Sequence, residues 1–202
     1  MTVSSNAIYL ASRSPRRREL LTQIGVTHEL LLTREVSPRT DVDEALRPGE
    51  SAHAYVERVA LLKAKMAVKA MHERKLPLQV ILSADTTVTI DGDVLGKPTS
   101  EADATRMLKR LSGNSHQVLT AIAVVADNDV LQMLSTSFVT FAPLADDDIA
   151  RYVASGESMD KAGSYAIQGL AASFIVKISG SYSGVMGLPL YETAKLLRQC
   201  RH

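Results

Sequence analysis

Short apolar runs alternate along this chain with segments of helical periodicity, and no other feature limits the fold as much. The runs at 7–11 (AIYLA) and 78–84 (LQVILSA) have the length and composition of buried strands. Between them, residues 51–74 carry apolar residues at three- and four-residue spacing, which predicts the longest helix. Strands that alternate with helices indicate an α/β fold in which helices pack on a sheet.

Hairpin signals make this sheet mixed rather than purely parallel. Residues 87–95 predict a hairpin that turns at Asp91-Gly92, and residues 116–126 and 130–141 predict two strands joined by a DND turn. The other expected elements are helices at 15–24, 100–111, 146–155 and 190–199, a loop at 33–50 and a β-rich segment at 166–178.

Length and composition indicate a single globular domain over residues 1–202. The chain exceeds the usual ~150 residues per domain only slightly, and no linker interrupts it. Its 46% hydrophobic and 22% charged residues exclude a disordered, collagen-like or coiled-coil chain. The formal charge of +1 argues against a nucleic-acid binder and against a membrane-surface protein, since both usually carry a basic excess.

The cysteine and histidine content excludes several redox and metal classes. Cys200 is the only cysteine, so neither an intrachain disulfide nor a Cys-based zinc site can form, and a cytoplasmic location is expected. The five histidines lack metal-ligand spacing. No apolar run reaches the ~18 residues of a membrane span, and residues 1–6 do not open a signal peptide.

The helix expected after the first strand opens with a basic turn. In the segment 12–18 (SRSPRRR), Ser14 is placed as the helix cap and Pro15 as the first helical residue. The positive end of a helix dipole favours acidic residues, so this basic turn does not serve local stability. Backbone N–H groups, the Ser12 and Ser14 hydroxyls and the arginines would instead converge on a phosphate. A solvated arginine-rich turn is the alternative, and the chain has no P-loop sequence.

Asp85 and Lys97 are candidates for chemistry on such a phosphate. Asp85 directly follows the apolar run at 78–84, and ligands gather at the carboxyl ends of strands, so it is placed to hold a metal or accept a proton. Lys97 stands between Gly96 and Pro98, which direct it toward a polyphosphate. The alternatives are a turn cap for Asp85 and an ordinary surface turn for Lys97.

Gln168 lies in an apolar stretch flanked by glycine (DKAGSYAIQG, residues 160–169). A glutamine in such surroundings needs partners for both its carbonyl and its amide group, which either the backbone or a ligand supplies. The acidic run at 146–148 is expected to be the cap and first turn of a helix rather than a binding site.

Taken in chain order, a series of segments resembles the Maf family of nucleoside triphosphate pyrophosphatases. The last two segments are similar to those of the subgroup that acts on dTTP and UTP. The matching segments are LASRSPRR (10–17), VDE (42–44), ERVALLKA (57–64), SADTTV (83–88), LGKP (95–98), LSGNSHQVLTA (111–121), DKAGSYAIQG (160–169) and GSYSGVMGLPL (180–190).

The resemblance implies a fold and a reaction. The fold is α/β, with a mixed, strongly bent sheet and two lobes around a cleft, as in ITPase-like proteins. The reaction is hydrolysis of a nucleoside triphosphate to the monophosphate and pyrophosphate. A divalent cation is implied too, and oxygen ligands favour Mg²⁺ or Mn²⁺. A homodimer is an expectation at the level of the family.

The resemblance also implies roles for individual residues. Asp85 resembles the general base, and Glu44 resembles an acidic residue that holds the metal together with Asp85. Arginine, lysine and metal would offset the charge that develops when water attacks a phosphate. The implied phosphate-binding residues are Ser12, Arg17, Lys63 and Lys97, and the implied base-selecting residues are Arg16, Thr86 and Gln168.

Two positions depart from the family pattern. Many members have a small residue where this chain has Arg13, and many have glutamate where it has Leu62. Two alternatives to the expected function are a nucleotide-sensing regulator linked to cell division and the same chemistry on other modified nucleotides. A nucleic-acid binder fits least, because the chain has three Phe and no Trp for stacking on bases.

Overall fold

The computed structural model describes residues 7–32, 43–127 and 129–200. Their strands form one mixed sheet of seven strands in the order β2-β1-β3-β5-β6-β7, with β4 paired to β3. β1 is parallel to β2 and β3, and the remaining pairs are antiparallel. The mixed α/β class is therefore confirmed. The strands are β1 Ile8–Leu10, β2 His28–Leu30, β3 Ile81–Ile90, β4 Asp93–Leu95, β5 Ser115–Ala126, β6 Asp129–Phe141 and β7 Ile175–Ser179.

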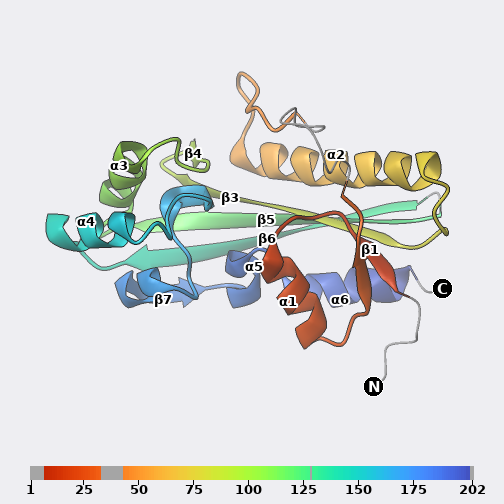
Figure 1. Cartoon of the computed structure of the whole chain (residues 1–202). Coiled ribbons are helices and arrows are strands. Elements are labelled where there is room, and N and C mark those ends of the chain that lie inside the picture. The colour runs from red at the N-terminus through yellow and green to blue at the C-terminus, as the bar shows by residue number, and fades with distance from the viewer. Residues whose placement is uncertain (1–6, 33–42, 128, 201–202) are drawn as a thin grey trace.

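Helices cover both faces of the sheet and one of its ends (Figure 1). α2 lies along one face, α1, α5 and α6 lie on the opposite face, and α3 and α4 pack together near β4. In the part of the chain that the structure describes, no helix is long and apolar enough to cross a membrane. The helices are α1 Pro15–Gln23, α2 Ala52–Glu73, α3 Glu101–Leu111, α4 Asp146–Ala154, α5 Tyr182–Met186 and α6 Leu190–Gln199, with 3₁₀ turns at Ala162–Ser164 and Leu170–Phe174.

The longest helix, α2, packs closely on the sheet because its inner face is built largely of alanine. Ala60, Ala64 and Ala67 are fully buried, and their small side chains let the helix approach β3 and β5. The Ser51 hydroxyl caps the helix by accepting a hydrogen bond from the Ala54 N–H at 3.2 Å. The predicted helix at 51–74 is confirmed.

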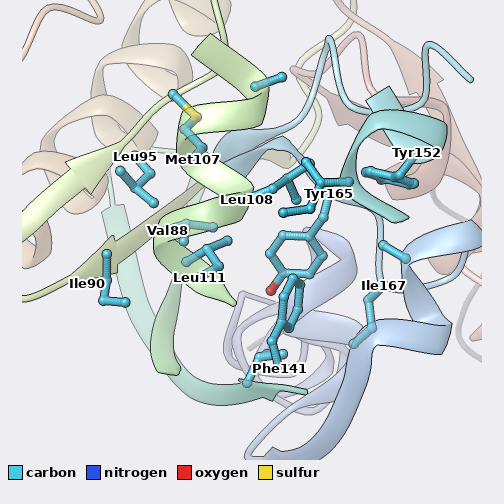
Figure 2. Packing of buried hydrophobic residues seen from close by; sticks show 14 of the residues in the cluster. Val88, Ile90, Leu95, Met107, Leu108, Leu111, Phe141, Tyr152, Tyr165 and Ile167 are labelled. Carbon is cyan, nitrogen blue, oxygen red and sulfur yellow. The ribbon is translucent and has the colours of Figure 1, made fainter. Parts of the chain in front are cut away.

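β3 and β5 contribute side chains to all three hydrophobic clusters of the core. One cluster lies under α2, one lies between the sheet and α1 and α6, and one lies between the sheet and α3 and α4. Even-numbered residues of β3 pack in the second and third clusters, whereas Ile81 packs under α2. Figure 2 shows the third cluster, in which α3 packs its Met107, Leu108 and Leu111 toward Val88 and Ile90.

Two of the expected elements are wrong. β3 begins at Ile81 and continues through Asp85 to Ile90, so Asp85 lies inside a strand and does not follow one. The reason is that the β-branched residues 86–90 favour a strand, and residues 86–89 pair with β5. The segment expected to be β-rich at 166–178 forms a strand only at its end, in β7, and a 3₁₀ turn before it.

Smaller differences concern ends and turns. The three aspartates 146–148 form the first turn of α4, as expected, but the cap position is taken by Ala145. The short helix α5 was not expected. The hairpin turn at Asp91-Gly92 is present, with both residues at positive φ. The loop expected at 33–50 and the DND turn fall partly on residues 33–42 and on residue 128, which lie outside the described residues, as do residues 1–6.

His116 is buried at the start of β5 within a cluster of aromatic rings. It is 1% exposed, and its Nε2 lies 2.8 Å from the Tyr165 hydroxyl. Its ring meets those of Phe141 and Tyr165 edge to face, with centroids 5.2 and 5.4 Å away. Figure 2 shows the Tyr165 and Phe141 rings next to each other. Burial lowers the pKa of His116 to about 4 from its ordinary 6.5.

This burial makes stability depend on pH. Below pH 6.5 the unfolded chain binds a proton at His116, whereas the folded protein keeps the ring neutral down to about pH 4, so acidification favours unfolding. We expect His116 to account for a fall of about 2 kcal/mol in the free energy of unfolding between pH 7 and pH 5. Denaturant titrations of the wild type and of His116→Gln measure this difference.

The exposed His53 provides the control. His53→Gln should keep the wild-type pH dependence, and His116→Gln should flatten it. Equal slopes for wild type and His116→Gln would show that the buried ring does not titrate in this way.

Candidate active site

The residues singled out in the sequence gather around one pocket of about 1150 Å³. Its walls come from the start of α1, the middle of β3, the inner side of α2 and the segments around Lys97 and Gln168. The members of the set that line it are Ser12, Arg16, Arg17, Glu44, Lys63, Asp85, Thr86, Lys97 and Gln168.

The Asp85 side chain faces α2, because side chains alternate between the two faces of the sheet along β3. The Ser83 hydroxyl, two residues earlier, donates to the Ala60 carbonyl of α2 at 2.7 Å. Lys63 lies one helical turn after Ala60, and its Nζ donates to Asp85 Oδ1 at 2.7 Å. The same Nζ lies 3.0 Å from Glu44 Oε1. The lysine therefore bridges two carboxylates that come from different parts of the chain.

The positions of these two carboxylates suit a divalent cation. Both lie within 3.0 Å of one positive charge, the Lys63 ammonium, so their oxygens already converge on a cation. Among the described residues there is no group of three or more His, Cys, Asp or Glu that could hold a metal. Two carboxylates supplemented by substrate phosphates are a donor set typical of Mg²⁺ sites. Leu62, at the position where the resemblance implies glutamate in many members, does not line the pocket.

Tyr55 supports the carboxylate end of the pocket. Its hydroxyl donates to the Glu44 carbonyl at 3.1 Å, which ties the segment before α2 to the helix. Burial, together with the charges of Asp85 and Glu44, raises the pKa of Tyr55 to about 12. The phenol therefore stays neutral and acts as a hydrogen-bond donor.

Arg17 joins three elements at the floor of the pocket. Its Nε donates to the Gly187 carbonyl at 2.7 Å, and its Nη1 donates to the Ala84 carbonyl at 2.8 Å and to Ser12 Oγ at 3.2 Å. Its Nη2 donates to Thr86 Oγ1 at 3.2 Å. Burial lowers the pKa of Arg17, yet an arginine keeps its charge in proteins. Arg17 also lines the pocket, so its charge acts on that space.

The Thr86 hydroxyl is engaged by the protein. It accepts from Arg17 and lies 3.0 Å from the Thr120 hydroxyl, which itself donates to the Gly184 carbonyl at 2.8 Å. Thr86 must therefore donate to Thr120. The chain of bonds runs from α1 through β3 and β5 to α5, so Thr86 is a fixed part of the wall.

The basic turn at the start of α1 differs from the expectation in one respect. Ser14 occupies the cap position with extended backbone, but its side chain makes no capping bond. The Ser14 N–H donates to Ser12 Oγ at 3.2 Å instead. The Arg16 Nε is buried and has no hydrogen-bond partner among the described residues. Arg13 is exposed at the rim of the pocket.

Lys97 and Gln168 both lie on exposed loops of the pocket. The Lys97 loop is anchored by the Gly163 N–H, which donates to the Gly96 carbonyl at 3.1 Å. Gly163 has φ +70°, and a Cβ there would lie 2.9 Å from Val88, so the tie requires glycine. Gln168 has no hydrogen bond within the described part of the chain. The backbone therefore does not satisfy its amide, contrary to one of the two expectations.

The sequence did not single out three further charged residues of the pocket, Glu157, Asp160 and Lys161. The Lys161 side chain is 15% exposed and forms an ion pair with Asp160. The sequence did carry a signal for Lys161, because it stands two residues before Gly163 in the same segment as Gln168. Glu157 gave no signal, because an acidic residue just after a helix normally lies on the surface.

Several known proteins are similar to this chain. The dTTP/UTP pyrophosphatase of Cupriavidus metallidurans is 54% identical over 96% of this chain and 97% of its own. That of Burkholderia lata is 56% identical over 96% of this chain and 93% of its own. The Ham1 protein of Staphylococcus aureus matches with a TM-score of 0.45 and 18% identity over 70% of this chain and 73% of that chain. Residues 7–200 match the Maf-like protein family, and the chain belongs to that family.

Proposed function

We propose that this protein hydrolyses dTTP and UTP to the nucleoside monophosphate and pyrophosphate. The observation that carries the proposal is the Asp85 carboxylate, held by Lys63 beside Glu44 in a pocket lined by arginines and lysines. Such a pocket offers a base next to charges that bind a triphosphate. The names of relatives with more than half of their residues identical support the same activity.

In this mechanism Asp85 is the general base. It takes a proton from a water whose oxygen bonds to the α-phosphorus, while the bond from that phosphorus to the bridging oxygen breaks and pyrophosphate leaves. Ser12, Lys63 and Lys97 bind phosphate oxygens, and Arg17 adds its charge from the floor of the pocket. A Mg²⁺ or Mn²⁺ ion held by Asp85 and Glu44 would neutralise phosphate charge and activate the water.

Gln168, with Arg16 and Thr86, selects the base. Uracil and thymine present a carbonyl acceptor beside an N–H donor, and a glutamine amide offers the complementary pair. Cytosine presents an amino donor and an unprotonated ring nitrogen acceptor there. A glutamine amide in a fixed orientation then faces donor with donor and acceptor with acceptor. Gln168 is exposed into the pocket without a protein partner, and the Thr86 side chain is held still by Arg17 and Thr120.

The regulatory alternative is less well supported. A protein that only senses nucleotides gains nothing from two carboxylates in an anion-binding pocket, because they repel the triphosphate. A carboxylate in that place is useful when a proton has to be moved.

A nucleotide panel with detection of pyrophosphate tests the function. With Mg²⁺ or Mn²⁺ the wild type should release pyrophosphate, not orthophosphate, from dTTP and UTP, and EDTA should stop the reaction. Asp85→Asn should lower kcat at least ~100-fold while the melting temperature stays near that of the wild type, since Glu44 still pairs with Lys63. Release of orthophosphate, or full activity of a folded Asp85→Asn protein, would overturn the assignment.

A second prediction separates Lys97 from Arg17. Lys97→Ala should lower kcat/KM about 100-fold for every triphosphate and leave stability within about 0.5 kcal/mol, because its side chain is exposed. Arg17→Ala should lower activity similarly and also cost about 2–4 kcal/mol of unfolding free energy, because the carbonyls of Ala84 and Gly187 lose their donor. Kinetics and denaturant titration of both variants measure this. Equal stability losses would contradict it.

A third prediction concerns the base. Gln168→Glu replaces the amide donors by an acceptor, so the preference for UTP over CTP in kcat/KM should narrow about ten- to hundredfold. Binding of inorganic tripolyphosphate should change little, since phosphate contacts lie elsewhere in the pocket. If the UTP/CTP ratio of Gln168→Glu equalled that of the wild type, base selection would belong to other residues.

A further inference from the structure

We propose that Tyr152 and Glu157 are positioning residues for base selection, because they fix the turn that presents Gln168. This inference rests on the proposed function and extends it to two residues that contact neither the phosphates nor the carboxylates described above. Tyr152 lies in the last turns of α4 and Glu157 lies just beyond the end of that helix. Their hydrogen bonds reach the backbone on both sides of Gln168.

Three hydrogen bonds connect the pair to the Gln168 turn. The Ala166 N–H donates to the Tyr152 hydroxyl at 3.2 Å, and that hydroxyl donates to Glu157 Oε1 at 2.9 Å. The Leu170 N–H donates to Glu157 Oε2 at 3.1 Å. Between these anchors, the Gly169 N–H donates to the Ala166 carbonyl at 3.1 Å and closes a turn with Gln168 at its corner.

Gly169 shows that the close approach of Glu157 is built into the fold. A Cβ on Gly169 would lie 2.2 Å from Glu157 Oε2 and 2.3 Å from Oε1. The backbone of Gly169 has φ −106°, so its conformation does not require glycine. A side chain at position 169 would therefore have to displace the Glu157 carboxylate.

Tyr152 and the two residues before Gln168 are buried, whereas Gln168 is exposed. Tyr152 is 3% exposed, and its ring meets that of Phe174 edge to face at 5.4 Å. Ala166 and Ile167 are also buried, and Figure 2 shows Ile167 and Tyr152 on the same side of the Tyr165 ring. Burial and the bond to Glu157 raise the pKa of Tyr152, so its hydroxyl stays a donor. Gln168 itself is exposed, so its direction comes from the turn.

Arg16, the arginine of the base-selecting set, reaches the same end of the pocket. Arg16 lies close enough to Tyr152 and Asp160 to interact with both electrostatically. Glu157 also lines the pocket beside Gln168 and Gly169. The Tyr152–Glu157 pair therefore contacts the segment proposed to select the base. It has no hydrogen bond to Lys63 or Asp85 in the described part of the chain.

The test is Tyr152→Phe, which removes one oxygen and leaves the ring in place. The Ala166 N–H and the Glu157 carboxylate then lose their shared partner, and the turn is released. We expect the UTP/CTP ratio of kcat/KM to fall about tenfold, mainly through a higher KM for UTP. The affinity for inorganic tripolyphosphate, measured by calorimetry with Mg²⁺, should stay within about twofold. Tyr191→Phe is the matched control, because Tyr191 is 71% exposed on α6.

Gly169→Ala provides an independent variant. Its methyl group displaces the Glu157 carboxylate without removing any hydrogen-bonding group, so it should reproduce the loss of selectivity seen with Tyr152→Phe. If Tyr152→Phe fails to fold, this variant carries the test. A folded Tyr152→Phe or Gly169→Ala protein with the wild-type UTP/CTP ratio would overturn the proposal.

A double-mutant cycle with Gln168→Ala shows whether the pair acts through Gln168. In the Gln168→Ala background, Tyr152→Phe should change the UTP/CTP ratio no further, whereas independent residues give additive effects. Additive losses would overturn the positioning role. Failure of the wild type to cleave UTP would instead overturn the proposed function. A ratio that responds to Gln168→Ala but not to Tyr152→Phe or Gly169→Ala refutes only the present inference.

Discussion

The long antiparallel pairing of β3 with β5 is the constraint on which the rest of the structure depends. It runs without interruption from Ile81 opposite Val125 to Thr89 opposite Gln117. Because side chains alternate across this strand, Ser83 and Asp85 face α2, while Ala84 and Thr86 face α1 and α5. One strand thus supplies the carboxylate to one side of the pocket and the threonine anchor to the other. A slip of one residue would exchange the two.

The one charged residue of β3, Asp85, adds little to stability through its ion pair with Lys63. Asp85 is 8% exposed, and desolvating a carboxylate and an ammonium usually offsets most of the gain from pairing them. Arg17 is different, since its hydrogen bonds satisfy the carbonyls of Ala84 and Gly187 and join α1 to two other segments. The pocket therefore contains two kinds of charged group. The Lys63–Asp85 ion pair adds little stability, whereas the Arg17 guanidinium connects three segments of the chain.

The sequence predicts those features that depend on local patterns. The 51–74 helix follows from its apolar spacing and from the Ser51 cap, and the hairpin turn follows from Asp91-Gly92. The sequence predicts Asp85 just after a strand because the apolar run ends at Ala84, whereas the pairing with β5 continues through Asp85. The turn around Gln168 could not be predicted, because the side chains that hold it, Tyr152 and Glu157, belong to a separate helix and its exit.

The two ends of the pocket are built by different parts of the chain. Lys63 and Asp85 belong to α2 and β3, whereas Gln168 is presented by a turn that α4 and its exit hold in place. Between them, a single backbone bond from Gly163 to Gly96 ties the Lys97 loop to the segment before Gln168. The Lys63–Asp85 pair therefore does not depend on the hydrogen bonds that hold the Gln168 turn. Under the proposed function, substitutions around α4 would alter which base is accepted while the carboxylates, Lys63 and the α1 turn keep their geometry.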